Sequence, residues 1–272
     1  MSTHPFDLLM QLDEPLIRLD CAALHLARDA YPGLSHECSL RQLDEIAARV
    51  AERRPGLEAP LRYSAMRDVL VEELEFRGNE EDYYDVENSY LNRVLERRLG
   101  IPLSLSVVWI EVGRRLKWPV TGVGFPCHFL VRFDDPDRFV IADAFRGGES
   151  LSLDDCRELL EARQPGLKFS MSMLEPVSTR AVLIRMLTNL RTIHLCAGRW
   201  GPAALVLERL IAADPTNAQH AQELAMVYKR SGDLRRAYAA LAAFIHRCPR
   251  SREFEAVCAS LERVESDLAG MN

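Results

Sequence analysis

Apolar residues recur at helical spacing from Leu16 to about Gly78. The segment "SLRQLDEIAARVAERRPG" (39–56) places Leu40, Leu43, Ile46, Ala47 and Val50 on one stripe, and Ser39 is positioned to cap it. A proline and a glycine end this segment, and a second apolar stripe of the same period follows over residues 66–74. Both segments are predicted to be packing helices that carry no chemistry of their own.

The apolar pattern changes from a helical period to alternation near residue 119. The segments 88–102 and 104–118 predict two helices, and the second is apolar enough to be almost wholly buried. The segments 120–126, 127–133 and 138–145 then read as strands, with "DDPD" as a turn between the last two and "RGGES" as a glycine turn after them. Residues 151–163 predict a short helix. An antiparallel hairpin or meander inside a mainly helical frame predicts the α+β class.

The last third of the chain repeats itself at an offset of 34 residues. This offset pairs Leu190 with Leu224, Gly198 with Gly232 and Pro215 with Pro249. A helix, a glycine turn, a second helix and a closing proline at this period predict two or three tetratricopeptide helix pairs. We therefore predict two domains, 1–176 with its core at 88–150, and an all-α region at 177–272.

Composition narrows the function classes. The chain has 272 residues, a net charge of -6 and no apolar run long enough to span a membrane. Its N-terminus lacks a basic segment followed by an apolar one, so we expect a cytoplasmic protein without a membrane partner. The acidic balance disfavours nucleic-acid binding, and the arginine pairs 97–98 and 114–115 are interpreted as solvated helix faces. Seven cysteines without a C-x-x-C pair argue against a disulfide framework and a zinc knuckle. The histidines outside the candidate site show no metal-ligand spacing and the chain has no phosphate-binding loop, so we predict no metal and no cofactor.

His128 and Asp143 form the one constellation that predicts chemistry. Pairing of the two strands across "DDPD" brings them close enough to hydrogen bond, which would hold the imidazole in one tautomer. A purely structural bond between them is the alternative. A catalytic arrangement needs a third partner, and the start of the buried helix before the strands is the place where a nucleophile would be activated.

The segment from "GNEEDYYDVENSY" (78–90) through "CHFLVRF" and "IADAFRGGESL" resembles the bacterial transglutaminase-like family named for the invasion-gene regulator SirB-one. The resemblance covers nearly the whole chain. It implies the fold of the transglutaminase and cysteine-protease superfamily, in which Cys, His and Asp occur in that order.

The chain departs from this pattern at the nucleophile. Where the resemblance implies a cysteine, the sequence has Ser104 and Ser106, about 200° apart on a helix, so that at most one can face His128. We favour Ser104, which is nearer the helix start, although a helix cap is its simpler role. Cys127 adjoins His128 on a predicted strand, so its side chain should point away from the imidazole. The resemblance implies a glycine at this position, and we interpret Cys127 as an incidental small residue.

Four further polar residues are candidates to line a pocket near this site. They are Asn88 and Asn92, for which we favour capping and turn bonding, Ser106, and Glu111, for which we favour a salt bridge to an arginine. Cys127 completes the set.

Two functions remain open. The leading hypothesis is a regulatory factor that lacks the catalytic cysteine and binds a protein or peptide through the cleft or the tetratricopeptide surface. The alternative is a serine-dependent hydrolase or acyl transferase acting on a peptide or amide, with Ser104 attacking, His128 as base and Asp143 orienting it. The oligomeric state is not predicted.

Overall fold

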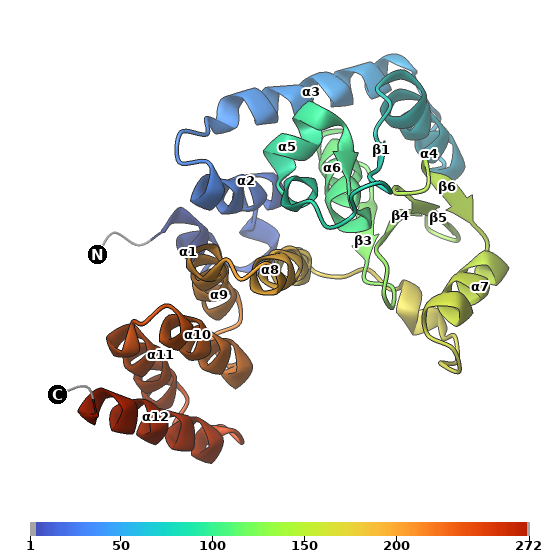
Figure 1. Cartoon of the computed structure of the whole chain (residues 1–272). Helices are drawn as coiled ribbons and strands as arrows, with labels where there is room; N and C mark the ends of the chain where they lie inside the picture. The colour runs from blue at the N-terminus through green and yellow to red at the C-terminus, as the bar shows by residue number, and fades with distance from the viewer. Residues whose placement is uncertain (1–3, 271–272) are drawn as a thin grey trace. The chain divides into compact units, whose positions relative to one another are not determined.

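The chain forms two compact units in a computed structural model that describes residues 4–270 (Figure 1). The larger unit comprises residues 13–182, and the smaller one combines the chain up to residue 12 with residues 183 onwards. Each unit is described by itself below.

The larger unit contains six helices, four shorter helical turns and six strands within the described residues. The helices are α2 (Leu19–Ala30), α3 (His36–Glu52), α4 (Ala59–Arg67), α5 (Leu91–Arg97), α6 (Pro102–Arg115) and α7 (Leu153–Arg163). The helical turns are η1 (Glu14–Leu16), the π-helical η2 (Asp68–Glu73), η3 (Val86–Ser89) and η4 (Met171–Leu174). The strands are β1 (Arg77–Gly78), β2 (Leu99–Gly100), β3 (Val120–Val123), β4 (Leu130–Asp134), β5 (Phe139–Asp143) and β6 (Glu149–Leu151).

Helix α3 starts earlier than its sequence pattern predicts. Ser35 occupies the N-cap position in an extended conformation, whereas Ser39 lies inside the helix and is buried. The predicted cap at Ser39 is therefore wrong, because residues 36–38 continue the helix in the N-terminal direction.

The sheet is an antiparallel meander in the order β3-β4-β5-β6. Strands β4 and β5 pair with Asp134 opposite Phe139 and Phe133 opposite Val140, as the "DDPD" turn predicts. The second half of the glycine turn adds the fourth strand, β6, opposite the end of β5. A separate parallel pair joins β1 and β2.

Both faces of the sheet are covered, which explains why β4 is apolar on both sides. Phe133 contacts the rings of Trp109 on α6 and Tyr63 on α4. Leu130, of opposite orientation on the same strand, belongs to a buried cluster that includes Leu160 of α7. Figure 1 shows α6 and the sheet in the interior of this unit, with α3 and α7 on its outside. The predicted α+β class is confirmed by this arrangement.

The smaller unit is all-helical. It contains α1 (Pro5–Leu9), most of α8 (Thr179–Cys196), α9 (Trp200–Ala213), α10 (Ala218–Arg230), α11 (Leu234–Arg247) and α12 (Phe254–Ala269). From α9 onward, each helix packs against the next one along the chain. Helices α9 and α11 begin and end 34 residues apart, and Gly198 and Gly232 both have positive φ angles in the turns before them.

The units divide at residues 182 and 183, whereas the sequence predicts a boundary between 176 and 177. Residues 4–12 also lie with the C-terminal helices rather than with the domain that follows them. Helix α1 packs against α9, and the buried Arg209 donates to both carboxylate oxygens of Asp7, at 2.9 and 2.8 Å. An ion pair between residues this far apart in the chain has no local sequence signature.

Candidate functional site

His128 and Asp143 are joined by the hydrogen bond that their spacing predicts. His128 Nε2 lies 2.7 Å from Asp143 Oδ2, and both side chains are buried. Asp143 ends β5 as expected, but His128 does not lie on a strand. It closes a turn in which its N–H donates to the Phe125 carbonyl, directly before β4 begins at Leu130. The turn places the imidazole beside the sheet rather than within the ladder.

Asp143 is held in a fixed orientation by the backbone that follows it. Its Oδ1 accepts from the N–H groups of Phe145 at 3.0 Å and Arg146 at 3.3 Å, and Arg146 Nε lies 3.9 Å from Oδ2. With one oxygen bonded to backbone, the other is left to face the imidazole. The His128–Asp143 pair therefore has the geometry in which a carboxylate orients a histidine.

The hydroxyl of Ser104 is engaged with backbone. It donates to the Asn88 carbonyl at 2.5 Å and accepts from the Ile101 N–H at 3.1 Å, and the Ile101 carbonyl is 3.3 Å away. The side chain is 2% exposed. Gly100 is needed beside it, because a Cβ at that position would meet Ser104 Oγ at 2.7 Å. Ser104 thus ties the start of α6 to η3.

Ser106 also bonds to backbone, within helix α6. Its hydroxyl donates to the Pro102 carbonyl at 2.7 Å, one turn earlier in α6, and the side chain is fully buried. No described hydrogen bond of Ser104 or Ser106 reaches His128. The histidine and the aspartate are thus brought together, and the two serines are bonded elsewhere.

Asn88 belongs to a loop-bracing network. Its amide donates to the Asp82 carbonyl at 2.7 Å, and its side-chain oxygen accepts from Asn79 at 3.1 Å. This matches the turn-bonding role rather than a pocket lining. Asn92, on α5, is partly buried, and its side-chain oxygen has no hydrogen-bond partner among the described residues.

Cys127 adopts a left-handed backbone conformation with φ of 54°. The residue is exposed, and its sulfur lies 3.1 Å from the Gln164 amide nitrogen. A positive φ favours glycine, so the turn before His128 carries backbone strain at this position.

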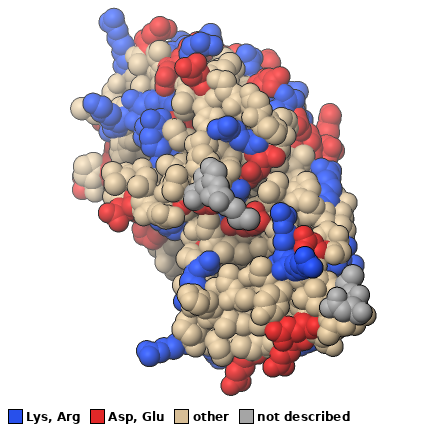
Figure 2. All heavy atoms as spheres, turned by 90° about the vertical axis from the view of Figure 1, so that its left-hand side faces the viewer, with Lys and Arg blue, Asp and Glu red and all other residues tan. Residues whose placement is uncertain are grey.

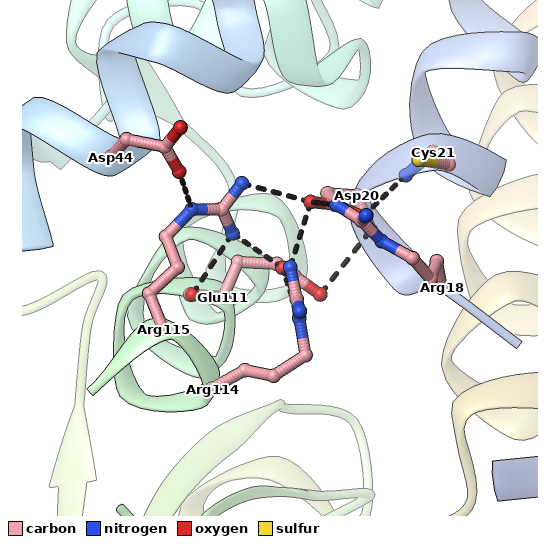
Figure 3. Close-up of polar contacts among 7 residues, drawn as sticks. All are labelled: Arg18, Asp20, Cys21, Asp44, Glu111, Arg114 and Arg115. Carbon is pink, nitrogen blue, oxygen red and sulfur yellow. Dashed lines mark hydrogen bonds and ion pairs between the residues drawn. The ribbon is translucent and has the colours of Figure 1, made fainter. Parts of the chain in front are cut away.

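Glu111 takes part in a buried cluster of charges between α2 and α6 (Figure 3). Its Oε2 accepts from Arg114 Nε at 2.8 Å and Arg115 Nη1 at 2.7 Å, and its Oε1 accepts from the Asp20 N–H at 3.2 Å. Asp20 Oδ2 in turn accepts from Arg18, Arg114 and Arg115, at 2.7 to 2.9 Å. Both carboxylates are fully buried.

The two carboxylates of this cluster have opposite pKa shifts. Burial disfavours the charge on Asp20, but its hydrogen bonds to Arg18 and Arg115 and the charge of Arg114 hold its pKa below the ordinary value. Burial and the negative charge of Asp20 raise the pKa of Glu111. Glu111 is therefore the group of the pair that takes up a proton more readily.

The sequence analysis offers a salt bridge to an arginine as a role for Glu111, and the structure has that bond. It did not predict the participation of Asp20, and its interpretation of Arg114 and Arg115 is wrong. Arg114 and Arg115 do not form a solvated helix face, since the Arg115 side chain is only 10% exposed and both arginines bond to buried carboxylates. Asp20, inside the apolar stripe of α2, was the available signal, because a lone carboxylate on a buried face requires a cation.

Within residues 4–270, no group of three His, Cys, Asp or Glu side chains is arranged to hold a metal ion. No helix in the same range is long and apolar enough to cross a bilayer. Basic and acidic side chains are interspersed on the face drawn in Figure 2.

Comparisons with known proteins agree with the fold, and the matched region contains the candidate site residues. The profile of the transglutaminase-like superfamily matches residues 37–188, which contain Ser104, His128 and Asp143. A UPF0162 protein of Xylella fastidiosa is 34% identical over 229 residues, covering 82% of each chain. A UPF0162 protein of Pseudomonas aeruginosa is 32% identical over 213 residues, covering 77% of each chain. The human F-box only protein 21 is 30% identical over 198 residues, which are 69% of this chain and 29% of that protein.

Proposed function

Because the chain belongs to the transglutaminase-like superfamily and is similar to UPF0162 proteins over most of its length, we propose that it is a binding protein built on an enzyme fold. It acts as a regulatory factor in the cytoplasm, and it lacks the catalytic cysteine of the superfamily. Its ligand is a protein or peptide segment. The observation that carries this proposal is the Ser104 hydroxyl, which is bonded to the Asn88 carbonyl and the Ile101 N–H.

Two further assignments belong to the proposal. The recurrence of α9 and α11 at 34 residues, with a positive-φ glycine before each, supports a tetratricopeptide region in the smaller unit. The motifs between residues 78 and 151 support membership of the SirB-one family. Both assignments favour recognition of a protein over chemistry on a small substrate.

Chemical labelling tests the absence of catalysis. A serine-reactive fluorophosphonate probe is expected to leave the purified full chain unlabelled, because a hydroxyl that donates to a backbone carbonyl is not poised to transfer its proton to a histidine. A serine hydrolase of known reactivity, treated in parallel, verifies the probe. Labelling that disappears in both the Ser104→Ala and His128→Ala variants would contradict the proposal.

That outcome would favour a serine-dependent hydrolase or acyl transferase on a peptide or amide. The bond of 2.7 Å between His128 and Asp143 supports this second function, since it preserves a base and its orienting carboxylate. Turnover of a peptide or amide substrate that is lost in His128→Ala would establish this second function.

Affinity capture tests the binding function and locates it. Tyr84 is 74% exposed in the loop whose neighbouring Tyr83 contacts Phe145, two residues after Asp143. Tyr238 is exposed on α11. We would capture proteins from a lysate of the source organism with the full chain and with the Tyr84→Ala and Tyr238→Ala variants. Each variant is the control for the other. One variant is expected to lose a captured protein that the other retains. Recovery of no protein above a bait-free control contradicts the proposal.

A further inference from the structure

A cavity of about 300 Å³ lies in the larger unit between the C-terminal half of α6, strand β3 and the first turn of α8. Its wall is mainly apolar, with Leu19, Ile110, Trp118, Val120 and Val182 among the lining residues. The size and the apolar wall are those of a site for a small organic molecule. The charge cluster of α2 and α6 borders it through Glu111 and Arg114.

Arg114 offers a donor to this cavity. Its Nε bonds to Glu111 and its Nη2 bonds to Asp20, whereas its Nη1 has no hydrogen bond to a described residue. The side chain is 43% exposed, so a ligand can reach the guanidinium. A planar guanidinium with a remaining N–H edge is suited to a carboxylate.

Thr121 adds a second donor on the opposite element. The residue lies on β3 and lines the same cavity, and its hydroxyl oxygen is enclosed without a hydrogen-bond partner among the described residues. Leaving a buried hydroxyl unpaired is costly, so an acceptor supplied by a ligand would stabilise this wall.

The charges around the cavity can accommodate an anion. Arg18, Arg114 and Arg115 balance Asp20, Asp44 and Glu111 when all three carboxyls are ionised. Glu111, whose pKa burial raises, can take up a proton when another negative charge arrives, which leaves the cluster with an excess positive charge.

We propose that this cavity binds a small amphiphilic carboxylate. The carboxylate accepts from Arg114 Nη1 and from the Thr121 hydroxyl, and the apolar body lies against Leu19, Ile110 and Val182. At roughly 30 Å³ for each non-hydrogen atom, the cavity holds about ten such atoms. Octanoate has this size and is the probe we choose.

This site goes beyond the proposed function and is separate from it. Neither Ser104, His128 nor Asp143 lines the cavity. A chain that captures a protein partner and fails to bind octanoate would leave the proposed function intact, and the reverse result would leave the cavity proposal intact.

Titration of the purified full chain with octanoate tests the proposal. Trp118 lines the cavity, so tryptophan fluorescence reports binding and calorimetry gives the stoichiometry. We expect saturable binding at one site, with 1-octanol and octylammonium at least about tenfold weaker because neither offers a charged acceptor. The absence of saturable octanoate binding, or equal binding of octanol, overturns the proposal.

Two variants test the position of the site. Thr121→Val keeps the side-chain shape and removes a hydroxyl that has no described partner, so it should fold as the wild type does and bind octanoate about tenfold more weakly. Val177→Phe fills the cavity from its rim and should abolish binding. The exposed Thr192→Val and Arg41→Gln serve as matched controls that retain the wild-type affinity. Unchanged affinity in Thr121→Val and Val177→Phe overturns the assignment.

Discussion

Ser104 shows how the role of one residue depends on what its side chain can reach. The hydroxyl bonds to the Ile101 N–H at the start of α6 and to the Asn88 carbonyl of η3. Its role is therefore to anchor the start of α6 to η3. Ser104→Ala removes the acceptor of the Ile101 N–H and a donor to the Asn88 carbonyl. We expect the free energy of unfolding to fall by about 1–3 kcal/mol, measured by urea denaturation.

Ser106→Ala is the matched control for this change. The Ser106 hydroxyl bonds to the Pro102 carbonyl within α6. Helix α6 keeps most of its stability when this bond is removed. We expect a loss of less than about 1 kcal/mol. Equal losses in the two variants would show that Ser104 is not an anchor.

Cys127 gives a prediction of the opposite sign. Its φ of 54° costs a non-glycine residue about 1 kcal/mol, and glycine relieves this strain at some cost in unfolded-chain entropy. Cys127→Gly should therefore raise the free energy of unfolding by about 0.5 kcal/mol. Cys38→Gly, an exposed helical position in α3, should lower it by about 1 kcal/mol. A destabilised Cys127→Gly would show that the turn tolerates its conformation without strain.

The sequence allowed one half of the candidate site to be predicted. Pairing of β4 with β5 across a short turn leaves few registers and brings the start of β4 beside Asp143. The turn before β4 then places His128 within reach of that carboxylate. The partner of Ser104 was not predictable. Any backbone carbonyl can accept a hydroxyl, and the choice of Asn88 depends on how η3 packs against α6.

At the scale of elements, periodicity predicted the helices and strands better than their ends. The meander β3-β4-β5 was predicted from the change of period in the sequence, and the "DDPD" turn set the register of β4 with β5. The π-helical turn η2 left no signal in the pattern, since its residues continue the apolar stripe of α4. Strand β6 was missed because pairing with β5, rather than its own composition, makes it a strand.

The charge cluster between α2 and α6 predicts how strongly these two elements depend on each other. Asp20→Asn removes the charge that three arginines share and leaves Glu111 as the buried carboxylate that pairs with both Arg114 and Arg115. We expect the free energy of unfolding to fall by about 3 kcal/mol, measured by chemical denaturation. Asp44→Asn removes an exposed carboxylate from the same arginine and should cost less than about 1 kcal/mol. Similar losses for both would contradict a buried, interdependent cluster.

At the scale of the whole molecule, buried histidines make the stability of the smaller unit depend on pH. The smaller unit buries two histidines, His194 and His220, and burial lowers the pKa of both. Asp214 and Glu223 partly oppose this shift at His220, while Arg191 adds to it. The imidazole lies 4.0 Å from Asp214.

Stability of the smaller unit should therefore decrease in acid. The unfolded chain binds protons at these histidines from about pH 6.5 downward, whereas the folded unit binds them only at lower pH, so stability is full above pH 6.5 and falls below it. His220→Gln should flatten this dependence between pH 7 and 5, measured by thermal unfolding. The exposed His246→Gln should keep the wild-type slope. An unchanged slope in His220→Gln would contradict the prediction.

The assignment of α1 to the C-terminal helices has a consequence for synthesis. Its partner helix α9 leaves the ribosome only after residues 13–182 have been made, which takes roughly 10–30 s at ordinary elongation rates. During this interval the larger unit can fold as a continuous segment, and the Arg180 N–H bond to Glu14 brings its two ends together. Phe6, fully buried in the final fold, is exposed to chaperones until translation is well past the middle of the chain.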